Sequence, residues 1–292
     1  MNPWLWSRLA PEVCDAKDPT LFLAIGTILS PRVPAEPRKV VFGSGCGQNR
    51  VPVLDHKWSI YGVRGPRTAA MLGLEPSLVL TDPAILVRRI PLPPQEKRFR
   101  FSLMLHHQSS FEADWAGICR SAGVHFIDPR VPVEQVLAEI QQTELLVTEA
   151  LHGAVVADAL RIPWIPVRLY GQFVEFKWLD WSESLEIPLK IASLPSIYQR
   201  DLFSSRGLTQ SFKALACAAG LGKTKWRKFR ILPSTQKELE DFWRAFNELV
   251  KNTEPCLSAQ STIQRTDQRL FETLARIRED WVRRDFKPRA GR

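Results

Sequence analysis

Apolar and polar residues follow one another along this chain in blocks that predict a parallel α/β fold. In residues 144–169, ELLVTEALHGAVVADALRIPWIPVRL, a short apolar run precedes residues at helical spacing, and a second extended apolar run follows Pro163. This order predicts a strand, a helix and another strand. Residues 100–142 alternate between strand-like and helix-like runs in the same way, which is typical of a parallel sheet with helices on both faces.

The first half of the chain shows a similar but less regular alternation. Strands are expected at residues 21–25, 39–42 and 59–63, and a short helix at residues 66–73, which begin with proline and end with glycine. Residues 90–98, IPLPPQEKR, contain three prolines and several charges, which favours a linker between two α/β halves.

We therefore expect three regions: two Rossmann-like domains at residues 1–92 and 93–200, and a basic helical region at residues 201–292. Within the last region, apolar positions recur at helical spacing in residues 234–251 and 262–286. The serine that opens the first of these spans stands where a helix N-cap is expected. The two helices could close a cleft between the domains, cross back to the first domain, or carry basic charge to a membrane surface.

Composition is ordinary for a soluble globular protein. The chain has 292 residues, of which 45% are hydrophobic and 24% charged. Asp15, Lys17 and Asp18 stand where the apolar core of a secretory signal would lie, and no apolar run is long enough to span a bilayer. The five cysteines are scattered, without the paired spacing of a zinc site. We therefore expect a cytoplasmic protein without a structural metal.

The net charge of +9 resides entirely in the last third of the chain. From Met1 to Gln199, 20 Lys and Arg residues are balanced by 20 Asp and Glu residues, and the densest basic run is KTKWRKFR at residues 223–230. A basic run with aromatic residues can bind phosphate backbones or an anionic membrane surface. No recognisable nucleic-acid-binding module accompanies it, so we expect no nucleic-acid partner and keep peripheral membrane contact as an open alternative.

His152 lies where the first strand of residues 144–169 gives way to the helix. Open parallel sheets place ligands at this edge, outside the carboxyl ends of their strands. A histidine there can donate or accept a proton near neutral pH, and the free N–H groups of the first helical turn favour an anion. Gly153 lets a ligand approach the backbone closely. A histidine that only packs or caps the helix is the alternative.

Two further candidates belong to the first half of the chain. Arg64 follows a predicted strand at a helix start, where a guanidinium can bind a carboxylate or a phosphate, or pair with a neighbouring acid. The glycine-rich stretch after the strand at residues 39–42 includes Gly45 and Gln48. Its backbone could approach a phosphate or a sugar, or form a tight strand exit.

Polar and aromatic side chains follow in the second half. His106 and His107 come directly after a predicted strand and could bind an anion or move protons, but no third residue at metal-ligand spacing accompanies them. Trp178 could stack on a sugar, although aromatic residues at helical spacing are also typical of a core. Asp82, at the end of an earlier apolar run, is interpreted as a turn or cap residue.

Each half of the chain contains one sequence motif that can be compared with known families. VRGPRT at residues 63–68, followed by TDPAIL at residues 81–86, resembles the VRGPxT…DPAxL pattern of the polysaccharide pyruvyl transferase family. LLVTEALHGAVVADALRIPWIP at residues 145–166 resembles its second signature, in which a strand runs into LHG. The branch that the chain most resembles adds pyruvate ketals to bacterial exopolysaccharides such as succinoglycan.

The resemblance implies two Rossmann-like domains in a GT-B-like arrangement, with the active site between them. It implies phosphoenolpyruvate as donor co-substrate, no other cofactor, and two hydroxyls of one sugar as acceptors, on a lipid-linked oligosaccharide or polysaccharide. His152 is then the expected catalytic acid and base. The expected donor-binding residues are Arg64, Gly153, His106 and Arg168, and the expected acceptor-binding residues are Gly45, Gln48, His107 and Trp178.

The chain departs from the family pattern in two places. Many members carry an arginine two positions before the histidine, where this chain has Ala150. Donor binding then needs another cation, for which Arg168, Arg67 and His106 are candidates. The family also usually opens with a strand and an Asn-x-Gly-Asp loop, whereas residues 2–9 have the pattern of a helix start. We therefore expect the first domain to lack this strand and loop.

Two other functions fit the same residues. A glycosyltransferase of similar architecture would use a nucleotide sugar. A non-catalytic relative of the enzyme would bind anions or a membrane surface. Stabilisation by a nucleotide sugar rather than by phosphoenolpyruvate would indicate the first alternative, and vesicle binding that depends on residues 223–230, without turnover, would indicate the second.

Overall fold

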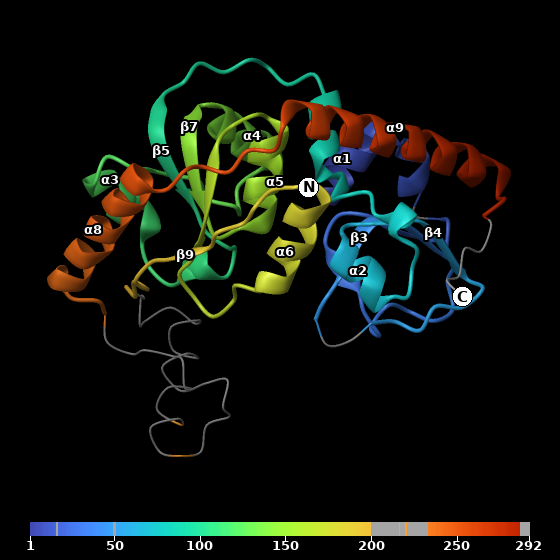
Figure 1. Ribbon diagram of the computed structural model, residues 1–292, viewed down its shortest axis with the longest axis horizontal. Coiled ribbons are helices and arrows are strands. Elements are labelled where there is room, and N and C mark those ends of the chain that lie inside the picture. Colours follow the sequence, from blue (N-terminus) through green and yellow to red (C-terminus); the bar gives the residue numbers. More distant parts are fainter. Residues whose placement is uncertain (16, 49–50, 200–215, 217–219, 221–232, 287–292) are drawn as a thin grey trace.

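Two parallel β-sheets lie side by side in the computed structural model, and helices cover them (Figure 1). This confirms the expected α/β fold of two Rossmann-like domains. The structure describes residues 1–15, 17–48, 51–199, 216, 220 and 233–286.

The first sheet is built around β3 (Lys39–Cys46), which pairs in parallel with every other strand of this sheet. β3 is buried over its whole length, and after Lys39 it consists of small and apolar residues, as is typical of a central parallel strand. The remaining elements of this domain are α1 (Asn2–Leu9), η1 (Pro11–Cys14), β1 (Leu21–Leu23), β2 (Thr27–Leu29), β4 (Trp58–Val63), α2 (Pro66–Met71), η2 (Pro76–Leu78) and η3 (Pro83–Arg89).

The second sheet has the strand order β6-β5-β7-β8-β9, and every pairing is parallel. The predicted alternation of strands and helices after residue 98 is confirmed. Helices connect successive strands, as parallel pairing requires, because the chain must return to the starting edge of the sheet each time. The elements are β5 (Phe99–Met104), η4 (Ser109–Phe111), α3 (Trp115–Ser121), β6 (His125–Phe126), α4 (Val133–Gln141), β7 (Thr143–Thr148), α5 (Leu151–Ala159), β8 (Trp164–Arg168), α6 (Glu175–Ser184) and β9 (Ala192–Ser193).

One hydrophobic cluster extends through both domains. It includes Leu86 of η3 and Val155 of α5, both fully buried, and these two elements pack against each other. Residues 90–98, without helix or strand, connect η3 to β5. Because the two domains share a core, the position of one relative to the other is determined by apolar packing as well as by polar contacts.

α8 (Gln236–Asn252) packs on the second domain, where Phe242 and Phe246 are fully buried. The predicted N-cap, Ser234, is wrong by one residue. Thr235 accepts the backbone N–H of the glutamate three positions later, and that glutamate accepts the N–H of Thr235, so the two form a capping box.

α9 (Gln260–Arg283) crosses back to the first domain and lies along it (Figure 1). The ring of Trp281 meets that of Phe22 edge-on, with their centroids 6.0 Å apart. Just beyond the helix, Arg284 pairs with Asp18. Of the three roles considered for the carboxyl-terminal helices, crossing back to the first domain is the one that α9 performs.

Part of the basic surplus has internal partners. Arg265, Arg278 and Arg284 each pair with an acidic side chain from another part of the chain. The densest basic run, Lys223–Arg230, lies outside the described residues. None of the helices that the structure describes is long and apolar enough to cross a membrane.

Candidate active site

A cavity of about 480 Å³ opens at the carboxyl edge of the second sheet. Residues that follow β5 and β7 line it together with parts of α4 and α6, and the first domain contributes Met1 and Thr27. Its volume is within the usual range for small-molecule sites. Of the expected site residues, His106, His107, His152, Gly153 and Trp178 line this cavity, whereas Arg64, Arg168, Gly45 and Gln48 do not.

His152 lies in the first turn of α5, beside a carboxylate of the other domain. Its Nε2 is 3.2 Å from Oδ2 of Asp82; the side chain of His152 is 40% exposed and that of Asp82 is fully buried. Gly153 lets α5 begin close to the sheet, because a Cβ there would lie only 2.8 Å from Oγ1 of Thr148. The pair therefore combines a solvent-accessible imidazole with a fixed, buried partner.

Asp82 does more than the predicted capping. Its Oδ1 accepts the backbone N–H of Ala84 at 3.0 Å and so caps η3, while Oδ2 faces His152. The preceding residue, Thr81, has a φ of 132°. Gly43 passes so close that a Cβ on it would lie 2.7 Å from the carbonyl oxygen of Thr81. The two motifs that resemble the pyruvyl transferase family thus meet in space, although 70 residues separate Asp82 from His152.

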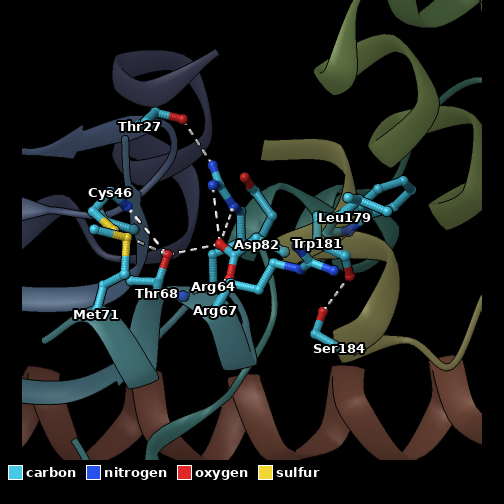
Figure 2. A network of polar contacts seen from close by, with 12 residues as sticks. Thr27, Cys46, Arg64, Arg67, Thr68, Met71, Asp82, Leu179, Trp181 and Ser184 are labelled. Carbon is cyan, nitrogen blue, oxygen red and sulfur yellow. Dashed lines mark hydrogen bonds and ion pairs between the residues drawn. The ribbon is translucent and has the colours of Figure 1, made fainter. Parts of the chain in front are cut away.

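Arg64 is not among the residues that line the cavity. It belongs to a network of polar contacts with Thr27 and Thr68 nearby (Figure 2). It is fully buried, its Nε donates to Oδ2 of Asp180 on α6 at 3.0 Å, and its Nη1 donates to Oγ1 of Thr27 at 2.9 Å. Thr68 donates to the same carboxylate from its N–H and its hydroxyl, each at 2.7 Å. Arg64 was expected to bind the donor. The structure corrects this, because a buried guanidinium needs a fixed partner and Asp180 already provides it.

The glycine-rich stretch continues β3, and its described residues, which end at Gln48, do not line the cavity. β3 extends through Cys46. Gly45 lies against Arg64, where a Cβ would be 2.3 Å from the guanidinium carbon, and Gln48 is exposed away from the cavity. The absence of a side chain at Gly45 therefore makes room for the buried arginine, which differs from the expected contact with a sugar.

Two of the cations considered as replacements for the arginine missing at Ala150 are already paired. Arg168 donates to Glu175 at 2.6 Å, and Arg67 binds both carboxylate oxygens of Glu183. Neither lines the cavity, whereas Ala150 does. Donor binding by Arg168 would require it to leave its carboxylate partner.

His106, the third candidate for this role, is expected to stay uncharged at neutral pH. Burial, and then the charges of His107 and Lys177, lower the pKa of His106 to about 4. Its Nδ1 accepts the N–H of Gln108 at 3.4 Å, which leaves Nε2 to carry the proton. His106 can therefore donate a hydrogen bond to an anion but contributes no positive charge.

The low pKa of His106 has a measurable effect on stability. An unfolded histidine titrates near pH 6.5, so between about 6.5 and 4 the unfolded state binds a proton that the folded state does not, and stability is lost as the pH falls through this range. A ring-proton NMR titration, with the signal assigned by its loss in His106→Gln, should show a midpoint far below 6.5. A midpoint near 6.5 would contradict the buried, neutral state.

Glu149, directly after β7, connects the ends of three strands by hydrogen bonds. Its carboxylate accepts the backbone N–H groups of Leu169 at 3.1 Å, Tyr170 at 2.9 Å and His106 at 3.4 Å. It is 2% exposed, and burial raises the pKa of this carboxyl against the opposing effect of the hydrogen bonds. Sequence reasoning missed this residue because its partners lie 20 to 43 residues away and no local pattern marks them.

Trp178 belongs mainly to the core. It is 1% exposed, and its ring stacks on that of Phe173 with centroids 5.3 Å apart. Sugar stacking needs a free aromatic face, which the buried Trp178 does not offer. The ring of Phe173 is partly exposed at the cavity, but it stacks on Trp178 and the guanidinium of Arg168 lies over it, 5.1 Å from its centroid.

Lys177 also lines the cavity, and sequence reasoning missed it as well. Its neighbours in α6 are aromatic residues at helical spacing, and the sequence pattern of this stretch pointed to them rather than to the lysine. Among the described residues, no group of three or more His, Cys, Asp or Glu side chains is placed to hold a metal ion.

Comparison with known proteins agrees with the motifs. A sequence model of the family "Polysaccharide pyruvyl transferase" matches residues 2–169. The succinoglycan biosynthesis protein ExoV of Rhizobium meliloti (strain 1021) is 36% identical over 199 residues, which are 67% of this chain and 63% of that protein. The chain thus matches less than two thirds of the length of this relative.

A solved structure shows a more distant likeness. The UDP-GlcNAc 2-epimerase of Methanocaldococcus jannaschii, crystallised with UDP-GlcNAc and UDP, matches 73% of this chain and 76% of its own, with 13% identical residues and a TM-score of 0.35. Similarity at this level says nothing about the ligands of the present chain.

Proposed function

Because the chain belongs to the polysaccharide pyruvyl transferase family, we propose that it transfers pyruvate from phosphoenolpyruvate to two hydroxyls of one exopolysaccharide sugar, as a ketal. The observation that carries this proposal is the pair of His152 and Asp82 at a helix start, on a cavity at the carboxyl edge of a parallel sheet. The relative with 36% identity acts in succinoglycan biosynthesis, which supports an exopolysaccharide repeat unit as the acceptor.

His152 is suited to the proton transfers of this reaction. The π bond between the methylene carbon of the donor and its neighbour breaks as the methylene carbon gains a proton. The neighbouring carbon also loses its bond to the phosphate oxygen, and it gains bonds to two sugar oxygens in place of these two. The two hydroxyls release two protons, of which one replaces the proton given to the methylene and the other leaves with phosphate. A single imidazole can give a proton to the methylene carbon and then take a proton from a sugar hydroxyl, while Asp82 holds the ring through its Nε2. The other ring nitrogen, Nδ1, has no hydrogen-bond partner within the described part of the chain.

Anion binding is supported by the start of α5. Ala150 has no side chain that caps this helix, so the first N–H groups of α5 remain available at the cavity. These groups, together with the proton on Nε2 of His106, can donate to the phosphate or carboxylate of the donor. Arg64 contributes indirectly, by holding α6 against the first domain.

We place the reaction at the cytoplasmic face of the membrane, on a lipid-linked oligosaccharide or polysaccharide. The support is chemical: a repeat unit under assembly is carried on lipid, and the chain has a basic surplus in its last third. The residues that would make a peripheral membrane contact, 223–230, lie outside the described ranges.

Ligand stabilisation tests the proposal. A ligand that binds only the folded state raises the unfolding temperature, so phosphoenolpyruvate should raise it and nucleotide sugars should not. Stabilisation by a nucleotide sugar alone would favour a glycosyltransferase. Stabilisation by neither would favour a non-catalytic binding protein.

A further inference from the structure

Lys177 is a cation on the cavity wall without an ion-pair partner in the described part of the chain. It is the third residue of α6 and is partly buried. The acidic residue of the same helical turn, Glu175, is engaged by Arg168 at 2.6 Å. Lys177 thus lines the cavity with a positive charge that no carboxylate neutralises.

The surroundings of Lys177 are unfavourable for a cation. It stands in the first turn of a helix, where the macrodipole favours negative charge. Burial, and then the nearby charge of Arg64, lower its pKa. Its charge acts on His106, which is itself uncharged at neutral pH. The carboxylate of Glu149, which lines the same cavity, is buried and already accepts three backbone N–H groups. A cation kept in such a place is best explained by an anion that binds it.

The three arginines considered above are placed less well than Lys177, because none of them lines the cavity. Each also has a carboxylate partner: Arg64 pairs with Asp180, Arg67 with Glu183 and Arg168 with Glu175.

We propose that Lys177 binds the phosphate group of the donor and stabilises it as it leaves, in place of the arginine that this chain lacks at Ala150. This assignment rests on the proposed function. A lysine ammonium acts as a point charge for phosphate, and phosphate carries more charge than the carboxylate of the same molecule. Lys177 lies beyond the residues matched by the family model, which end at 169, so it comes from a part of the chain that this match does not cover.

Binding of fragments of the donor tests this assignment. Lys177→Gln removes the charge and keeps the stem of the side chain. Loss of a hydrogen bond to a charged group should raise the half-saturating concentration of phosphoenolpyruvate, and of inorganic phosphate, roughly 10- to 100-fold. Pyruvate, which has no phosphate, should stabilise the variant as well as it does the wild type. Lys177→Arg should retain most of the phosphate response.

Lys190→Gln is the matched control, because it removes the same charge from an exposed lysine outside the cavity. It should leave the responses to all three ligands unchanged. Without ligand, Lys177→Gln should be at least as stable as the wild type, since the substitution removes an unpaired cation from a helix start. A lysine retained only for packing would instead give a less stable variant.

The outcomes separate this assignment from the proposed function. An unchanged response of Lys177→Gln to phosphate and phosphoenolpyruvate overturns the assignment and leaves the proposed function standing. Loss of the pyruvate response alone also overturns it and assigns Lys177 to the carboxylate. If phosphate but not phosphoenolpyruvate stabilises the wild type, and Lys177→Gln abolishes that effect, the anion site stands and the proposed donor fails. A wild type that responds to neither ligand overturns both.

Discussion

Replacing His152 with alanine is expected to lower phosphate release from phosphoenolpyruvate and acceptor by a factor of about 10²–10⁴, the usual contribution of a general acid and base. The wild type should release phosphate only when both substrates are present. His56→Ala is the matched control, because His56 is exposed and lies outside the cavity. Undiminished activity of His152→Ala would remove His152 from the mechanism.

A second variant of the same pair separates orientation from proton transfer. Asp82→Asn retains an oxygen that can accept the N–H of Ala84, so the cap of η3 is kept, but it removes the carboxylate that faces His152. We expect a smaller loss of kcat than in His152→Ala, because the imidazole remains in place but a neutral amide holds it instead of the carboxylate. Wild-type activity of Asp82→Asn would limit Asp82 to the cap.

Replacing Asp180 with alanine is expected to destabilise the folded protein by about 3–5 kcal/mol, the usual result when one partner of a buried ion pair is removed. Both side chains are fully buried, and among the described residues Arg64 would keep only its hydrogen bond to the hydroxyl of Thr27. The midpoint of chemical unfolding measures the effect. Activity should fall as well, because the pair holds the second domain, with His152, against the first domain, with Asp82.

Glu183→Ala is the matched control, since Glu183 lies on the same helix as Asp180 and pairs with Arg67, three residues after Arg64. That pair is about two-fifths exposed on each side and should contribute only about 0.2–1 kcal/mol. The double variant Arg64→Met/Asp180→Leu should recover much of the stability lost in Asp180→Ala, because no unpaired charge remains buried. Equal losses in Asp180→Ala and Glu183→Ala would show that burial of the first pair is unimportant.

These contacts give a physical meaning to the motif VRGPRT. Arg64 forms the buried pair, and Thr68 adds two hydrogen bonds to the same carboxylate. Gly65 lies directly against α6: a Cβ there would be 1.7 Å from the carbonyl oxygen of Asp180. Any side chain at this position would push α6 away. The motif therefore positions the two domains, and only indirectly the substrate.

Most of the second domain could be predicted from the sequence, because each of its elements has a local pattern. Buried parallel strands are short apolar runs, and the helices between them carry apolar residues at helical spacing. For the same reason, the placement of His106 and His152 at the carboxyl edge follows from the ends of β5 and β7. The first domain was harder, since the glycines of β3 suggested a loop, and only the close approach of Arg64 and Thr81 explains them as part of a strand.

The sequence by itself determined the parallel α/β class and, through two motifs, the likeness to one family. It also identified His152, at the end of a strand, as the candidate acid and base. These features depend on residues that are adjacent in the chain. Only the tertiary structure decided which side chains meet: Asp82 with His152, and Arg64 with Asp180 across 116 residues. It also showed that Lys177, on the cavity wall, has no ion-pair partner among the residues that the structure describes. Pairing of side chains across the two domains depends on how the two cores pack. Whether a charged side chain is free to bind a ligand depends on its neighbours in space, and these are set by the tertiary structure.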